Sequence, residues 1–141
     1  MNVDKRAREE LVFLLELFIN GRITNFDFEE RLPSTQDKGV NAVIDSVWCL
    51  YDDFKEHTMR NEHELSSNEK NAINRWILFL KTDLVYDWPI ISYPGVRPLK
   101  VTFIDKLLGK KKKEDKFMEN GSYKLWPFKN SEDYNKAKDA H

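Results

Sequence analysis

The sequence is poor in the residues on which several classes of protein depend. Among 141 residues there are one cysteine, five glycines and five prolines, and the formal net charge is -1. The lone Cys49 excludes an internal disulfide and a cysteine-based zinc cage. The glycines do not form a phosphate-binding loop of either common kind. A nearly neutral chain is also not a polycation built to bind nucleic acid.

Long apolar runs are missing as well. The apolar stretch Leu11–Ile19 spans nine residues and contains Glu16, whereas a membrane-spanning helix needs about 20 apolar residues. The N-terminus does not read as a secretory signal, since Lys5 and Arg6 are followed by Glu9 and Glu10 in place of an apolar stretch. We therefore expect a soluble protein of the cytoplasm, with no membrane segment.

Helical periodicity is the main feature of residues 1–84. Apolar residues recur every three or four positions over 4–20, 40–56 and 68–83. Thr24 and Asp27 resemble a capping box at the start of a short helix that ends near Arg31. Residues 57–66 are expected to form a polar loop. The side chains expected to be buried are Leu14, Phe18, Val47, Tyr51, Trp76 and Leu80.

The pattern changes after Leu84. Pro89, Pro94 and Pro98 exclude a continuous helix there. Asn120-Gly121 predicts a β-hairpin that joins 116–119 to 122–126. Short helices are expected over 102–108 and from Ser131 onward. Together these patterns predict one domain (1–141) that is mainly α: a three-to-four-helix bundle (1–84) wrapped by an irregular, aromatic segment (85–141).

Charge is divided unevenly along the chain. Residues 1–70 hold nine basic and fifteen acidic residues, a net charge of -6, and residues 71–141 have a net charge of +5. On a helix over 40–56, the carboxylates Asp45, Asp52, Asp53 and Glu56 would lie along one side. This acidic face is the candidate partner-binding surface, because carboxylates on a rigid element attract a basic partner. The same pattern is also typical of a solvated helix face.

Two further patterns leave alternatives open. Asp53 and His57 are four residues apart and could serve a metal-dependent enzyme, but the spacing of His57 and His63 matches no zinc signature. We therefore expect no metal, no cofactor and no catalytic site on these histidines. The run Lys110–Lys113 could serve a nucleic-acid accessory protein, although a like-charge block of this kind is more typical of an exposed connector.

Several phrases of the sequence resemble those of a group of small uncharacterised bacterial proteins. They are residues 18–24 (FINGRIT), 48–53 (WCLYDD), 75–80 (RWILFL), 86–89 (YDWP) and 126–128 (WPF). Proteins of this size and style are often immunity proteins paired with secreted or contact-delivered toxins, so the resemblance implies a protein that binds another protein. It assigns no role to any single residue.

Taken together, these observations predict a soluble cytoplasmic protein-binding module, in its sharpest form an immunity protein that neutralises a cationic toxin by surface occlusion. The enzyme and the nucleic-acid accessory protein remain the alternatives.

Overall fold

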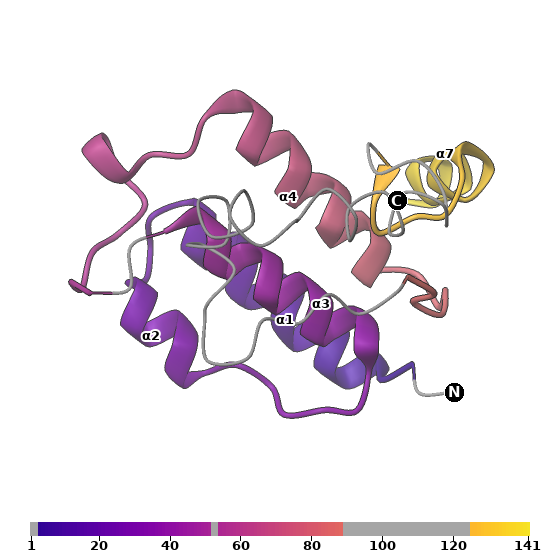
Figure 1. Ribbon diagram of the computed structural model, residues 1–141, viewed down its shortest axis with the longest axis horizontal. Helices are drawn as coiled ribbons and strands as arrows, with labels where there is room; N and C mark the ends of the chain where they lie inside the picture. The colour runs from indigo at the N-terminus through magenta and orange to yellow at the C-terminus, as the bar shows by residue number, and fades with distance from the viewer. Residues whose placement is uncertain (1–2, 52–53, 89–124) are drawn as a thin grey trace, which may run out of the picture.

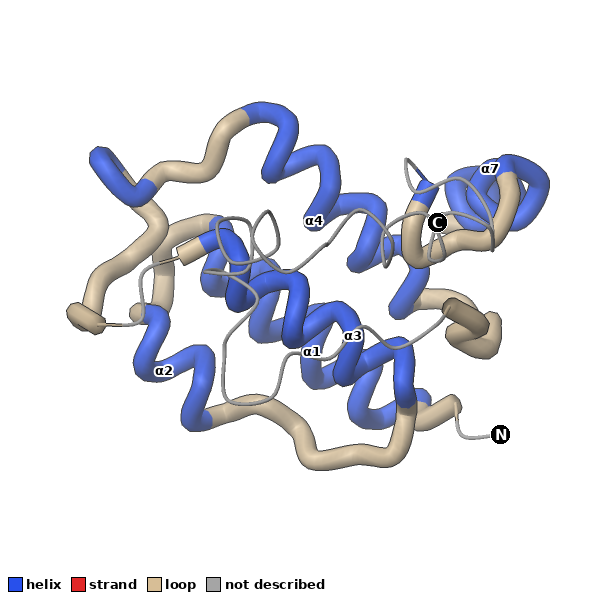
Figure 2. Tube along the Cα trace, in the orientation of Figure 1, coloured by secondary structure: helices blue, strands red, loops and turns tan. Residues whose placement is uncertain are grey.

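The fold is mainly α-helical in a computed structural model that describes residues 3–51, 54–88 and 125–141. No strand occurs among the described residues. Figures 1 and 2 show α1 and α3 running together, with α4 crossing above them and α7 at the end of the molecule opposite α2. The helices are α1 (Lys5–Ile19), α2 (Asn25–Glu30), α3 (Lys38–Val47), η1 (Trp48–Leu50), η2 (Asn61–His63), α4 (Ser67–Leu80) and α7 (Ser131–Ala140).

Side-chain caps set where the helices begin. Thr24 with Asp27 forms the predicted capping box of α2, and Ser66 with Glu69 forms a second one at α4. Asp4 caps α1 by accepting a hydrogen bond from the backbone N–H of Ala7. Each cap satisfies backbone donors that the helix leaves unpaired in its first turn.

Gly21 ends α1 in a left-handed conformation, with φ 69°. Glycine adopts this conformation without strain. The Arg60 guanidinium lies directly over Gly21 and donates from Nε to its carbonyl at 3.1 Å, so a side chain at position 21 would collide with Arg60.

The core is continuous through the helices and contains all six side chains expected to be buried, which range from 1% exposed for Phe18 to 7% for Trp76. Phe18 on α1 stacks on Phe28 of α2 at 4.7 Å between ring centroids, and Tyr51 meets Phe18 edge-on at 5.2 Å. Offset and edge-on arrangements of this kind are the favoured geometries for aromatic pairs.

The predicted helix over 40–56 is wrong beyond Leu50. The helix α3 ends at Val47, η1 follows, and Tyr51 is already extended. Phe54, expected on the apolar stripe, is 72% exposed. The reason is a tertiary contact with Asn25, which is fully buried. Its Nδ2 donates to the carbonyl of Lys55 at 3.0 Å, and its side-chain oxygen accepts from the N–H of His57 at 2.8 Å. Asn25 therefore satisfies backbone groups that a helix would otherwise pair.

The C-terminal residues 125–141 pack on α4 through aromatic side chains. The Trp126 ring meets Trp76 edge-on at 5.7 Å, and Arg75 Nε donates to the Trp126 carbonyl at 2.7 Å. Trp88 Nε1 donates to the Pro127 carbonyl at 3.0 Å. The peptide bond between Trp126 and Pro127 is cis. Residues 125–141 therefore lie against the helical core, as expected for the end of the wrapping segment.

Other expectations for the C-terminal half have mixed outcomes. The last helix begins at Ser131 as predicted, with Asn130 as its cap. Leu125 and Trp126, expected at the end of a strand, lie in a helical turn instead. The rest of the predicted hairpin and the predicted helix over 102–108 lie outside the described residues.

A buried ion pair joins three parts of the chain. Arg8 and Asp37 are 1% and 2% exposed, and Arg8 Nε lies 2.7 Å from the Asp37 carboxylate. Arg8 also donates to the carbonyls of Thr82 at 2.7 Å and Leu84 at 2.8 Å, just after α4. The sequence analysis overlooked Arg8, although it falls at helical spacing from the buried residue Leu11.

Asp37 also uses its carboxylate to cap α3. Its Oδ1 accepts from the backbone N–H of Gly39 at 2.9 Å, and Oδ2 accepts from the N–H of Asp4 at 2.9 Å. Burial opposes ionisation of this carboxyl, but the hydrogen bonds from Arg8, Asp4 and Gly39 outweigh it and lower the pKa of Asp37.

Replacing Trp76 by alanine is expected to cost about 3–5 kcal/mol of the free energy of unfolding, because a large buried ring is lost. Trp76→Phe should cost less, roughly 1–2 kcal/mol. The phenyl ring keeps part of the contact with Trp126, and the Trp76 indole N–H has no hydrogen-bond acceptor in the described structure to lose. Urea denaturation of the three proteins measures both changes. Equal losses for the two variants would contradict this account.

The single variants Arg8→Met and Asp37→Asn are each expected to lose about 3–5 kcal/mol of stability, because each leaves a buried charge without its partner. The double variant should lose much less than the sum of the two, since it leaves neither charge behind. A double-mutant cycle in urea measures the coupling. Additive losses would show that the two side chains act independently.

The lowered pKa of Asp37 also predicts an acid dependence of stability. A carboxyl with a lower pKa in the folded state stabilises the fold above its unfolded pKa, and this stabilisation disappears as the pH falls through the folded value. The stability difference between the wild type and Asp37→Asn should therefore be constant from pH 7 to about pH 5 and shrink below about pH 4. Urea titrations along this series provide the measurement. A difference that persists unchanged at the acid end would refute the prediction.

Candidate functional site

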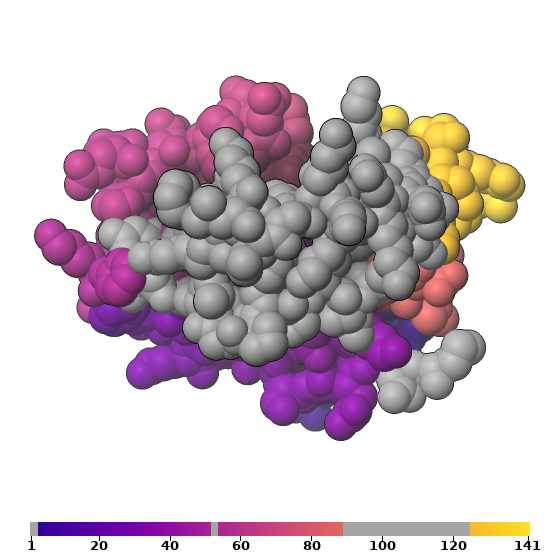
Figure 3. Space-filling model, viewed as in Figure 1, coloured from indigo at the N-terminus to yellow at the C-terminus, as the bar shows by residue number. Residues whose placement is uncertain are grey.

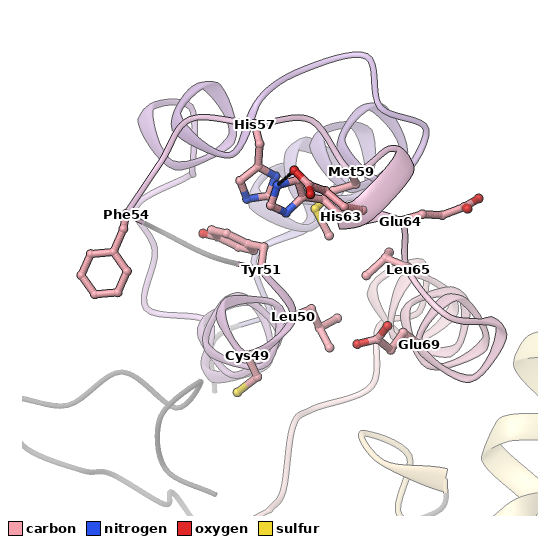
Figure 4. Close-up of a pocket in the computed structure, with 11 residues that line it drawn as sticks. Cys49, Leu50, Tyr51, Phe54, His57, Met59, His63, Glu64, Leu65 and Glu69 are labelled. Carbon is pink, nitrogen blue, oxygen red and sulfur yellow. Dashed lines mark ion pairs between the residues drawn. The ribbon is translucent and has the colours of Figure 1, made fainter. Parts of the chain in front are cut away.

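An open hollow of about 490 Å³ lies between the end of η1, the following loop and the start of α4. Leu50 and Tyr51 lie below the two histidines, Glu69 points toward them from α4, and the carboxylate of Glu64 points away (Figure 4). All of its lining comes from one stretch of chain: Cys49, Leu50, Tyr51, Phe54, His57, Met59, Glu62, His63, Glu64, Leu65 and Glu69.

Two imidazoles form a flat surface in this hollow. The rings of His57 and His63 are stacked, with centroids 3.7 Å apart and planes 13° from parallel. Tyr51 meets the His57 ring edge-on at 6.4 Å, so the stack continues the aromatic cluster of the core outward to the surface. Figure 4 shows the two histidine rings facing one another above Tyr51.

The loop that presents His57 is held by backbone hydrogen bonds. Asn25 N donates to the His57 carbonyl at 3.0 Å, and the Asn25 side chain accepts from the His57 N–H. Further along, the buried Met59 and Leu65 fix the loop against the core. This confirms the polar loop expected over 57–66 and gives the hollow a defined shape.

Carboxylates surround the hollow. Glu62 Oε1 lies 3.6 Å from His63 Nε2, and the Glu62 side chain is 86% exposed. Glu69 points inward from the first turn of α4 (Figure 4), and its Oε1 accepts from the N–H of Ser66 at 2.8 Å. Glu64 forms an exposed ion pair with Lys70 at 3.4 Å.

The structure does not place the four predicted partner-binding residues on one helix face. Asp45 lies on α3, whereas Glu56 lies in the loop after η1, where its Oε2 accepts from the Thr24 hydroxyl at 2.7 Å. Asp52 and Asp53 lie outside the described residues. The spacing argument was wrong because α3 ends at Val47, and a role of these residues in binding remains a prediction.

Asp45 nevertheless has an unusual environment. The residue is exposed as a whole, yet neighbouring protein atoms displace water from its carboxyl and raise its pKa. No ion pair among the described residues involves Asp45.

The histidines do not assemble a metal site with the other described residues. No group of three or more histidine, cysteine or carboxylate side chains in the described ranges could hold a metal ion. The nitrogen lone pairs of two stacked rings lie in separate, nearly parallel planes about 3.7 Å apart, so the two imidazoles are poorly placed to ligate one ion together. Residues 54–57 are not helical, so the helix on which Asp53 and His57 were expected to be paired does not extend to His57. Asp53 itself lies outside the described residues.

Comparisons with known proteins identify no relative. No protein-family model, curated protein or solved structure matches the chain. No helix in the described residues is long and apolar enough to cross a bilayer. The site must therefore be interpreted from its own residues.

The sequence analysis missed the hollow itself. It placed His63 in a polar loop over 57–66, and it placed residue 50 inside a longer helix over 40–56. The available signal was charge density: residues 45–69 contain seven carboxylates and two cations, a net charge of -5. The lysine run Lys110–Lys113 lies outside the described residues.

Proposed function

We propose that the chain is a protein-binding module that captures a basic partner with residues 45–69, which we name the acidic segment. The observation that supports this best is the coincidence of charge and shape. The segment with a net charge of -5 is also the segment that forms the whole lining of the hollow. Surface concavity together with one sign of charge favours a partner of the opposite sign.

The charges of the acidic segment are mostly accessible to such a partner. The described carboxylates Asp45, Glu56, Glu62 and Glu64 are all exposed. Of the two cations in the segment, Arg60 directs its guanidinium to the carbonyls of Gly21 and Asn20. It therefore neutralises little of the surface, and the segment keeps its negative field.

The exposed Phe54 adds an apolar contact to this charged surface. Its side chain is 72% exposed and projects away from the histidine pair (Figure 4). Exposed aromatic side chains are typical anchors in protein interfaces. An apolar anchor beside carboxylates fits a partner that presents both basic and apolar groups.

Occlusion is the mechanism that we propose for such a module. The negative field would steer a basic partner onto the acidic segment and raise the association rate at low salt. The bound module would then cover the partner's basic surface. Among protein-binding modules, an immunity protein that neutralises a cationic toxin fits this mechanism, in line with the resemblance described above.

The decisive experiment is capture of the product of the adjacent gene by the purified chain. The variant Asp52→Lys/Asp53→Lys should lose capture with an unchanged melting curve, because the proposal assigns both carboxylates to the partner-facing surface, and carboxylates on a surface contribute under about 1 kcal/mol to folding. Capture by the wild type should weaken as salt increases, since salt screens exposed charges.

A matched control keeps the charge change constant. Glu9→Lys/Asp139→Lys also changes the net charge by +4, on exposed residues of α1 and α7. The yellow helix α7 lies at the end of the molecule opposite η2 (Figure 3), so this control should retain capture. Undiminished capture by Asp52→Lys/Asp53→Lys would overturn the proposal. Loss of capture only when Lys110–Lys113 are changed would also overturn the proposal, and it would assign binding to residues 71–141, the basic half of the chain.

A further inference from the structure

We propose that the hollow takes an arginine side chain of the basic partner, in preference to a lysine. This inference rests on the proposed function and names the group that the acidic segment recognises. Three properties of the hollow match a guanidinium group: an apolar floor, a flat aromatic surface and carboxylates at its edge.

The floor suits the methylene stem of a long basic side chain. Tyr51, Met59 and Leu65 are 3%, 4% and 5% exposed, so their outer atoms form a dense apolar base. Leu50 extends this base toward α4 (Figure 4). Long cationic side chains commonly cover apolar surface with their stems while the charged head stays near water.

The imidazole pair supplies the flat surface. The side chain of His63 is 32% exposed, and its ring is held parallel to that of His57. A planar guanidinium stacks on such a ring, whereas an ammonium group is a compact, strongly hydrated point charge. The stack therefore favours arginine over lysine by shape as well as by charge.

Carboxylates complete the match. Glu62 stands beside the His63 ring, with 3.6 Å between Oε1 and Nε2, and Glu69 points inward from α4. A guanidinium that stacks on His63 can donate in its own plane to a carboxylate at the ring edge, since its N–H groups form a fixed fork. The existing Glu64–Lys70 pair is exposed and so costs little to rearrange.

The test compares hexa-arginine with hexa-lysine, which have equal length and charge. Each peptide is titrated into the full ¹⁵N-labelled chain at low ionic strength and mildly alkaline pH, and amide shifts give the dissociation constants. Hexa-arginine should bind roughly two- to fivefold more tightly, the range expected for stacking of a cation on a ring. The largest shifts should fall on residues 49–69. Equal affinities, or shifts centred elsewhere, would overturn the inference.

Variants of His63 separate stacking from charge. His63→Ala should abolish the preference for arginine, and His63→Phe should retain it because the flat ring remains. Glu62→Gln/Glu64→Gln should weaken both peptides without removing the preference. The amide spectrum of each variant shows that the fold is intact. A preference that survives His63→Ala would refute the stacking arrangement.

The outcome is distinguishable from that of the proposed function. Equal binding of the two peptides, with partner capture still lost in Asp52→Lys/Asp53→Lys, would reject the arginine site and leave the acidic segment as the capture surface. Undiminished capture by that variant would reject the proposed function itself, and with it the partner to which the arginine was assigned.

Discussion

The contact between Arg8 and Asp37 constrains more of this fold than any other polar interaction described above. It lies in the core at 1% and 2% exposure and joins the first turns of α1 and α3 to the segment after α4. Charged groups without water need every hydrogen bond that the structure gives them. The positions of the first turn of α1, the first turn of α3 and the segment after α4 therefore depend on one another, since Arg8 contacts both Asp37, which caps α3, and the carbonyls after α4.

The shape of the candidate site depends in turn on where α3 ends. If α3 had continued to residue 56, its carboxylates would have formed a simple outer stripe and no hollow would exist. The buried Asn25 instead binds the backbone of Lys55 and His57, and Tyr51 turns into the core, where its ring meets those of Phe18 and Phe28 edge-on. The hydrogen bonds of one buried amide, that of Asn25, thus replace the expected helix face by a concave surface. The stacked imidazoles of His57 and His63 form part of its wall.

Local signals made much of the fold predictable. The helices α1, α2 and α4 begin at caps that can be recognised from residue type and spacing, Asp4, Thr24 and Ser66, and their apolar periodicity identifies the buried face. The non-helical path of residues 54–57 could not be predicted in this way, because the backbone of Lys55 and His57 bonds to Asn25, which lies far away in sequence. The hollow was missed for the same reason: its lining is brought together by a loop that has no repeating pattern.

The arrangement of tryptophans has a spectroscopic consequence. Trp76, Trp88 and Trp126 gather where the C-terminal residues meet α4, and Trp76 and Trp126 cross at 87° with centroids 5.7 Å apart. Near-ultraviolet circular dichroism and indole emission will therefore report chiefly on the docking of residues 125–141. The other described tryptophan, Trp48 in η1, lies in the element that leads into the hollow. In a Trp48→Phe variant the remaining indole signal would come from Trp76, Trp88 and Trp126, so loosening of the C-terminal end could be followed without a contribution from η1.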